Sequence, residues 1–142
     1  MSTAAVPRRP SPASMPAHRP ASATAHHPDP AITFRDLYTY GIDTSSLHIH
    51  HKLVAYGLAI HADADGQIQP KDQPHMAGLV LDTSLHPGQV AVALTALRQR
   101  GWIKQIRKSD RYETADFRLT IPPALEPRLR RSAAARHPQP TN

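Results

Sequence analysis

The chain has 142 residues and a formal net charge of +6, with no cysteine and 15 prolines. Without cysteine it has no disulfide framework, thiolate metal site or cysteine nucleophile, and no apolar run is long enough to span a membrane, so we expect a cytoplasmic protein. Seven prolines fall in residues 1–30 and five in residues 122–142. This distribution predicts two disordered tails around one folded domain over residues 31–121.

The positive charge is unevenly distributed along the chain. The two tails carry +2 and +3, residues 31–97 carry −3, and residues 98–121 carry +4. A basic chain favours a polyanion such as nucleic acid as its partner. We therefore expect residues 98–121 and the tails to contact that partner, and residues 125–135 to form a short basic helix once something binds them.

The first predicted elements precede a strong helix. Residues 32–34 alternate as in a strand, and residues 35–40 are expected to form a helical turn that ends at Gly41. Residues 43–46 offer N-cap side chains for a helix over about residues 47–60, which carries a broad apolar face.

Two further helices and a hairpin follow. A turn at residues 62–66 leads to a second helix over residues 71–81, and a third helix begins at Pro87 and ends before Gly101. The two segments after it alternate apolar and polar residues, at 102–106 and 117–121, around a basic stretch. This pattern predicts a β-hairpin with one buried face and a charged turn.

Three helices followed by a basic hairpin is the order of elements in a winged helix-turn-helix domain. The most specific segment is residues 93–103, ALTALRQRGWI, which has the form of an exit from a third helix into a wing. Over about residues 47–107 the chain resembles the bacterial winged helix-turn-helix DNA-binding domains of phage, plasmid and replication-initiator-like proteins. The resemblance implies a mainly α-helical (α+β) fold with a small β-hairpin, and double-stranded DNA as the partner.

The resemblance also implies that the third helix enters the DNA major groove. The positions carried over to this chain are His86 at the N-cap, Gly88, Gln89, Ala91, Val92 and Thr95. An amide such as Gln89 can pair with an adenine edge, and Val92 or Ala91 can contact a thymine methyl group. No arginine lies on this face, so a packing surface or a protein-contact surface is the alternative.

Basic residues gather on and beside the hairpin turn. They are Lys104, Arg107, Lys108 and Arg111, with Arg98 and Arg100 at the end of the preceding helix. Phosphate contacts there would give sequence-independent affinity that weakens with salt. The alternative is a solvated hairpin next to a helix whose terminal arginines interact with its dipole.

Two patterns approach the spacing of metal sites, and each has a simpler interpretation. His48 and His51 can share a helix face, but no cysteine or nearby glutamate completes a site, so a solvated helix start is favoured. Residues 61–72 approach the spacing of a calcium loop, yet the first ligand is His61 and the last is Asp72, so a connecting turn is favoured. We expect no metal and no cofactor.

The predicted function is that of a DNA-binding protein. No glycine-rich phosphate loop or nucleophile-elbow motif is present, so we expect no enzyme activity. A transcriptional regulator or an accessory factor of a mobile element is favoured. The alternatives are a protein-interaction module and a sequence-nonspecific nucleoid or replication accessory. A homodimer is also open, because Met76, Leu79 and Leu81 can serve either a dimer contact or the core.

Overall fold

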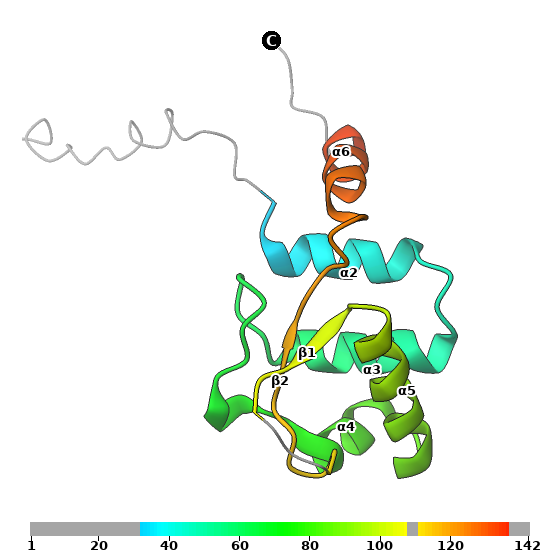
Figure 1. Cartoon of the computed structure of the whole chain (residues 1–142), viewed down its shortest axis with the longest axis vertical. Helices are drawn as coiled ribbons and strands as arrows, with labels where there is room; N and C mark the ends of the chain where they lie inside the picture. Colours follow the sequence, from blue (N-terminus) through cyan, green and yellow to red (C-terminus); the bar gives the residue numbers. More distant parts are fainter. Residues whose placement is uncertain (1–31, 108–110, 137–142) are drawn as a thin grey trace, which may run out of the picture. The chain divides into compact units, whose positions relative to one another are not determined.

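The computed structural model describes residues 32–107 and 111–136, so the predicted tail over residues 1–30 lies outside the described residues, as does Lys108. Figure 1 shows how the elements are arranged. In chain order they are α2 (Phe34–Thr44), α3 (Ile49–Ile60), the 3-10 helix η3 (Pro70–Asp72), α4 (His75–Thr83), α5 (Pro87–Gln99), β1 (Ile103–Gln105), β2 (Phe117–Leu119) and α6 (Glu126–Arg136).

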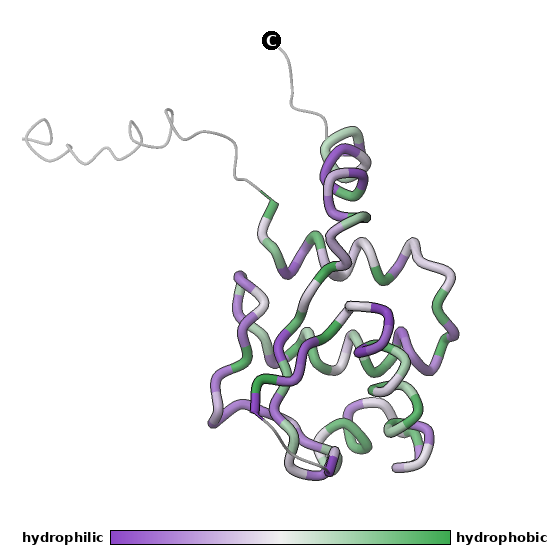
Figure 2. The backbone as a smooth tube through the Cα atoms, in the orientation of Figure 1, coloured by the Kyte–Doolittle hydropathy of each residue, from purple (hydrophilic) through white to green (hydrophobic). Residues whose placement is uncertain are grey.

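The mainly helical α+β architecture with one small hairpin is confirmed. Helices α3, α4 and α5 pack on one another, α2 lies against α3, and the hairpin follows α5. The fully buried side chains come from all these helices, among them Leu37, Tyr38, Val54, Leu58, Leu79, Val90, Leu94 and Leu97. Figure 2 shows apolar residues alternating with polar ones along these helices and along the strands of the hairpin.

The prediction of a strand at residues 32–34 is wrong. Thr33 caps α2 instead, because its hydroxyl oxygen accepts a hydrogen bond from the Asp36 amide at 3.1 Å. Leu37, Tyr38 and Ile42 are buried at helical spacing. The helix also continues through Gly41 to Thr44, so the predicted end at Gly41 and the predicted N-cap role of residues 43–46 are both wrong.

Helix α3 begins at a histidine cap. His48 Nδ1 accepts a hydrogen bond from the His50 amide at 3.0 Å, which satisfies one free N–H group of the first turn. The buried face of α3 is formed by Val54, Ala55, Gly57, Leu58 and Ala59, as its apolar pattern predicts.

The predicted second helix over residues 71–81 is broken near its start. Pro74 has no amide hydrogen, and α4 begins only at His75. The buried side chain of Gln73 explains the break, because its Nε2 donates to the carbonyls of Ile68 at 3.1 Å and Phe117 at 2.8 Å. Its Oε1 accepts from the Phe117 amide at 3.0 Å. Gln73 therefore attaches the end of η3 to the start of β2.

The third helix and the hairpin form where they are predicted. Helix α5 begins at Pro87, and Gly101 has a φ of +85°, which a glycine adopts without strain. The Trp102 amide then donates to the Leu97 carbonyl at 2.8 Å. The strands pair antiparallel, with Ile103 opposite Leu119, Lys104 opposite Arg118, and Gln105 opposite Phe117.

The predicted disordered tail over residues 122–142 is wrong for residues 126–136, which form α6. The short basic helix expected over residues 125–135 on binding is here part of the folded domain. Leu125, Leu129 and Ala133 recur at every fourth position, and Ala133 is only 3% exposed. Helix α6 packs against α2, as Figure 1 shows. The folded domain therefore continues through residue 136, and it includes the arginines that the sequence alone assigned to a tail.

Candidate nucleic-acid interface

The outward face of α5 carries no charge over its first two turns. Gly88 is exposed and has no atom within 4 Å of the position that a Cβ would occupy. Val92 is 62% exposed, and Ala91 is half-buried. This face can make apolar contacts along a groove, but it has no ionic group that would bind phosphate.

Gln89 is engaged in capping its own helix. Its Oε1 accepts a hydrogen bond from the amide of His86, the N-cap residue, at 3.0 Å. Bidentate recognition of an adenine edge needs both the oxygen and the nitrogen of an amide. While this cap is formed, Oε1 already accepts one hydrogen bond and is oriented toward the His86 amide. Bidentate pairing with adenine would therefore require Gln89 to leave the cap or to share this oxygen.

Thr95 faces the hairpin turn rather than solvent. Its hydroxyl donates to the Ala91 carbonyl at 3.0 Å and lies 2.8 Å from the Tyr112 hydroxyl. The Tyr112 ring lies 6.1 Å from the Phe117 ring, and the Arg98 guanidinium is 5.7 Å from the Tyr112 centroid. Sequence reasoning missed Tyr112, whose only signal was an aromatic residue within a polar, basic turn.

Arg98 and Arg107, which were predicted to contact phosphate, bond to side chains of the same domain. Arg98 donates to Gln105 Oε1 at 3.2 Å, which joins the end of α5 to β1. Arg107 forms an ion pair with Asp116 at 2.9 Å, and His75 Nε2 lies 3.0 Å from the other Asp116 oxygen. Asp116 is buried, whereas the Arg107 side chain is 68% exposed. Arg107 is thus held in place while much of its surface remains accessible.

The remaining basic residues of the hairpin do not form one cluster. Lys104 is exposed and lies opposite Arg118 in the ladder. Like charges at opposed positions destabilise a sheet, and a bound polyanion would relieve this repulsion. Arg111 is exposed immediately after residues 108–110, the gap in the described chain.

A histidine-lined cavity of about 610 Å³ lies between the first turns of α3 and α5. Its histidines are His48, His50, His51 and His86, and it also includes Gly88, Gln89 and Val92. Partial burial lowers the pKa of His51 below its ordinary 6.5, and the charges of His48 and Arg100 lower this pKa further. Sequence reasoning placed three of these histidines at a helix start, but it did not place them beside α5.

Neither metal pattern assembles a ligand cluster in the part of the chain that the structure covers. Across residues 32–107 and 111–136, no three His, Asp or Glu side chains form a group that could hold a metal ion. In the turn that approaches calcium-loop spacing, Asp63 Oδ1 accepts from the amides of Asp65 at 2.9 Å and Gln67 at 3.0 Å. His61 lies 2.8 Å from Asp82 on α4. These local bonds account for the turn.

In comparisons with known proteins, no family model matches the chain, and no curated protein and no solved structure is significantly similar to it. None of the helices in the described part of the chain has the length and apolar character needed to cross a membrane.

Proposed function

We propose that the protein binds duplex DNA with a winged helix-turn-helix domain, in which α4 and α5 form the helix-turn-helix and the hairpin forms the wing. The main observation in support is the set of contacts that Tyr112 makes with Thr95 and Arg98. They hold the basic hairpin turn beside a helix whose outer face is open. A helix in the major groove flanked by a phosphate-binding wing needs this arrangement.

The hairpin and α5 have different roles in this binding. Arg98, Arg107, Lys104 and Arg111 contact phosphate and supply affinity for any sequence. Gly88 and Val92 bring the α5 backbone and a methyl surface close to the bases, where thymine methyl groups are the matching chemistry. The protein then acts in the nucleoid as a transcriptional regulator or as an accessory factor of a mobile element, without catalysis.

The wing is tested by replacing two exposed basic residues, Lys104→Gln and Arg111→Gln, and measuring affinity for random duplex by fluorescence anisotropy across a salt series. We expect weaker binding to every sequence and a salt slope reduced by about 0.9 for each phosphate that is no longer neutralised. Lys71→Gln is the matched control, because Lys71 is an exposed lysine on η3 that is not among the residues proposed to contact phosphate. An equal effect of the control substitution would refute a local phosphate contact.

Base reading by α5 is tested at Gln89 after a preferred site has been selected from a random duplex pool. Gln89→Glu retains an oxygen that can accept from the His86 amide. Its negative charge repels the DNA, so affinity for the selected site should fall while thermal stability is kept. Gln89→Ala should lower stability, and it should lower affinity for the selected site more than affinity for random duplex.

A protein contact is the second candidate function, and the exposure of Val92 on an uncharged helix face favours it. Val92→Glu separates the two functions when it is combined with the duplex assay at low salt. No duplex binding by the wild-type protein, together with loss of a co-purifying partner in Val92→Glu, would favour the protein contact. Saturable duplex binding that Val92→Glu weakens would favour DNA.

A further inference from the structure

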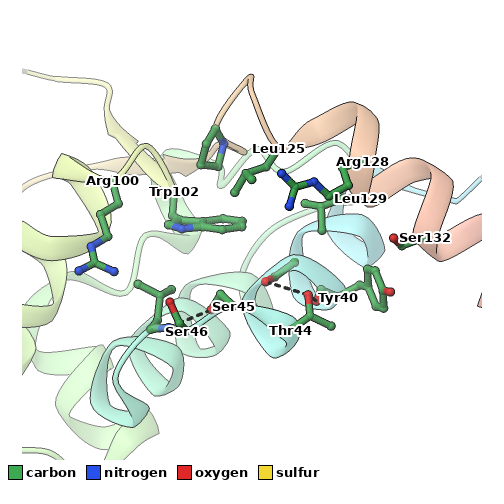
Figure 3. Close-up of a pocket in the computed structure, with 13 residues that line it drawn as sticks. Tyr40, Thr44, Ser45, Ser46, Arg100, Trp102, Leu125, Arg128, Leu129 and Ser132 are labelled. Carbon is green, nitrogen blue, oxygen red and sulfur yellow. Dashed lines mark hydrogen bonds between the residues drawn. The ribbon is translucent and has the colours of Figure 1, made fainter.

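A second cavity lies at the other end of α5, between α2 and α6. Its volume is about 600 Å³, which is in the range of small-molecule sites. The end of α2, the turn from α5 into β1, and one face of α6 form its walls. Figure 3 shows Arg100 and Arg128 on opposite sides of the Trp102 ring, with Tyr40 and Thr44 below on α2.

The apolar wall of this cavity is held rigidly in place. The Trp102 ring meets the ring of Tyr38 edge to face, with 5.7 Å between centroids. The absence of a side chain on Gly41 lets Trp102 and Leu129 approach the backbone of α2, since a Cβ there would lie 2.9 Å from Leu129 Cδ1. Leu125 adds to the same wall. The surface is therefore preformed rather than created by a ligand.

The charge around the cavity has one sign. Arg100 and Arg128 are its only ionic lining residues, and both are exposed. Within the described residues neither guanidinium has an ion pair, whereas Arg130 on the same helix bonds Glu126 at 2.9 Å. The positive charge of Arg100 also acts on His51 outside the cavity, where it contributes to lowering the pKa of that histidine. An anion in the cavity would find two guanidinium groups without a competing carboxylate.

An apolar wall between two such arginines matches an amphipathic anion. Guanidinium groups bind carboxylates through paired, charge-assisted hydrogen bonds. A free phosphate ion would use the arginines but would leave the Trp102, Leu125 and Leu129 surfaces without a partner. We propose that this cavity is a binding site for a small organic carboxylate with a hydrocarbon body, which would lie against Trp102 while Arg128 binds the charged group and the charge of Arg100 attracts it from the opposite wall.

The test uses octanoate as the probe and the full chain as the receptor. Trp102 is the only tryptophan, so the single indole N–H resonance in a ¹H–¹⁵N NMR spectrum reports on this cavity. We expect octanoate to shift this resonance saturably, octanol to bind at least about tenfold more weakly, and inorganic phosphate to leave it unchanged. No saturable shift with octanoate, or equal binding of octanol, would overturn the proposal, as would an equal response to phosphate.

Matched arginine variants locate the site. Arg128→Gln should weaken octanoate binding about tenfold, because it removes a charge-assisted bond. Arg131→Gln removes the same charge from α6, but Arg131 is exposed and does not line the cavity. The affinity of this variant for octanoate should therefore stay within about twofold of that of the wild type. Equal effects of the two variants would show only general attraction of anions to α6 and would refute the site. Arg100→Gln is the second test from the opposite wall, and full affinity in both Arg100→Gln and Arg128→Gln would also refute it.

Discussion

The hydroxyl oxygens of Thr95 and Tyr112 lie 2.8 Å apart, which joins the middle of α5 to the turn of the hairpin. The two residues are 17 positions apart in the chain, and both are half-buried. The Thr95 hydroxyl also bonds the Ala91 carbonyl, so the contact continues into the helix backbone. The position of the hairpin turn relative to the outer face of α5 therefore depends on this pair.

A double-mutant cycle measures the contribution of this pair to stability. We expect Thr95→Val and Tyr112→Phe each to lower the free energy of unfolding by about 1 kcal/mol, because each removes one hydroxyl of a half-buried hydrogen bond. The double variant should cost less than the sum of the two, with a coupling of at least about 0.5 kcal/mol. Urea denaturation measures all four proteins, and strictly additive losses of stability would show that the hydroxyls do not interact.

Local signals in the sequence were sufficient for α5 and the hairpin. Pro87 and Gly101 mark the ends of the helix, and the alternation on both sides of the basic stretch defines the strands. The break before α4 was not predictable in the same way. It depends on Gln73, whose side chain bonds the backbone of Phe117, 44 positions further along the chain.

A helix over residues 125–135 was expected only on binding, and its packing against α2 was missed because its sequence is dominated by arginine. Three residues spaced four apart, Leu125, Leu129 and Ala133, are enough to attach it. The surface that they cover is formed by Gly41 and Trp102, which are remote in the sequence. A short apolar stripe has predictive value only once its partner surface is known. The same reason explains why the cavity beneath α6 left no signal in the sequence.

The fit of α6 against α2 can be tested with two glycines. Gly41→Ala places a Cβ 2.9 Å from Leu129 and 3.0 Å from Trp102. Overpacking should cost about 1–3 kcal/mol against a helix-propensity gain of about 1 kcal/mol, so we expect a net loss of up to about 2 kcal/mol. Gly88→Ala is the control, since its Cβ meets open space and the change should stabilise the protein by up to about 1 kcal/mol. A stabilising Gly41→Ala would contradict the docking of α6.

The buried hydroxyl of Tyr38 is predicted to be a cost to stability. Its side chain is fully buried, and within the described structure its hydroxyl has no hydrogen-bond partner. Burial accordingly raises the pKa of Tyr38 far above its usual value. We expect Tyr38→Phe to raise the free energy of unfolding by about 1 kcal/mol, because a desolvated hydroxyl is removed while the ring contact with Trp102 is kept.

Tyr56→Phe is the matched control for that measurement. The Tyr56 hydroxyl lies 3.4 Å from Asp43 Oδ1 at the surface, so its removal should leave stability unchanged or slightly lower it. Chemical denaturation of both variants decides the point. A destabilised Tyr38→Phe would mean that the buried hydroxyl is satisfied in solution.

The lowered pKa of His51 predicts a loss of stability in mild acid. Above its ordinary pKa of 6.5, His51 is neutral in both the folded and the unfolded chain, so it contributes no pH dependence. As the pH falls through 6.5 the unfolded chain takes up a proton that the folded chain resists, and the free energy of unfolding therefore falls. The decrease levels off once the pH is below the folded pKa, where both states are protonated.

Thermal melts over this pH range test the assignment to His51. His51→Gln should show a smaller fall in melting temperature than wild type, because its side chain does not titrate. Arg100→Gln should reduce the fall in part, since burial and His48 act on the pKa of His51 as well as Arg100. An unchanged pH dependence in His51→Gln would assign the effect to another group. Reduced dependence in both variants would establish that the positive charge at the end of α5 acts on the histidines at the start of α3.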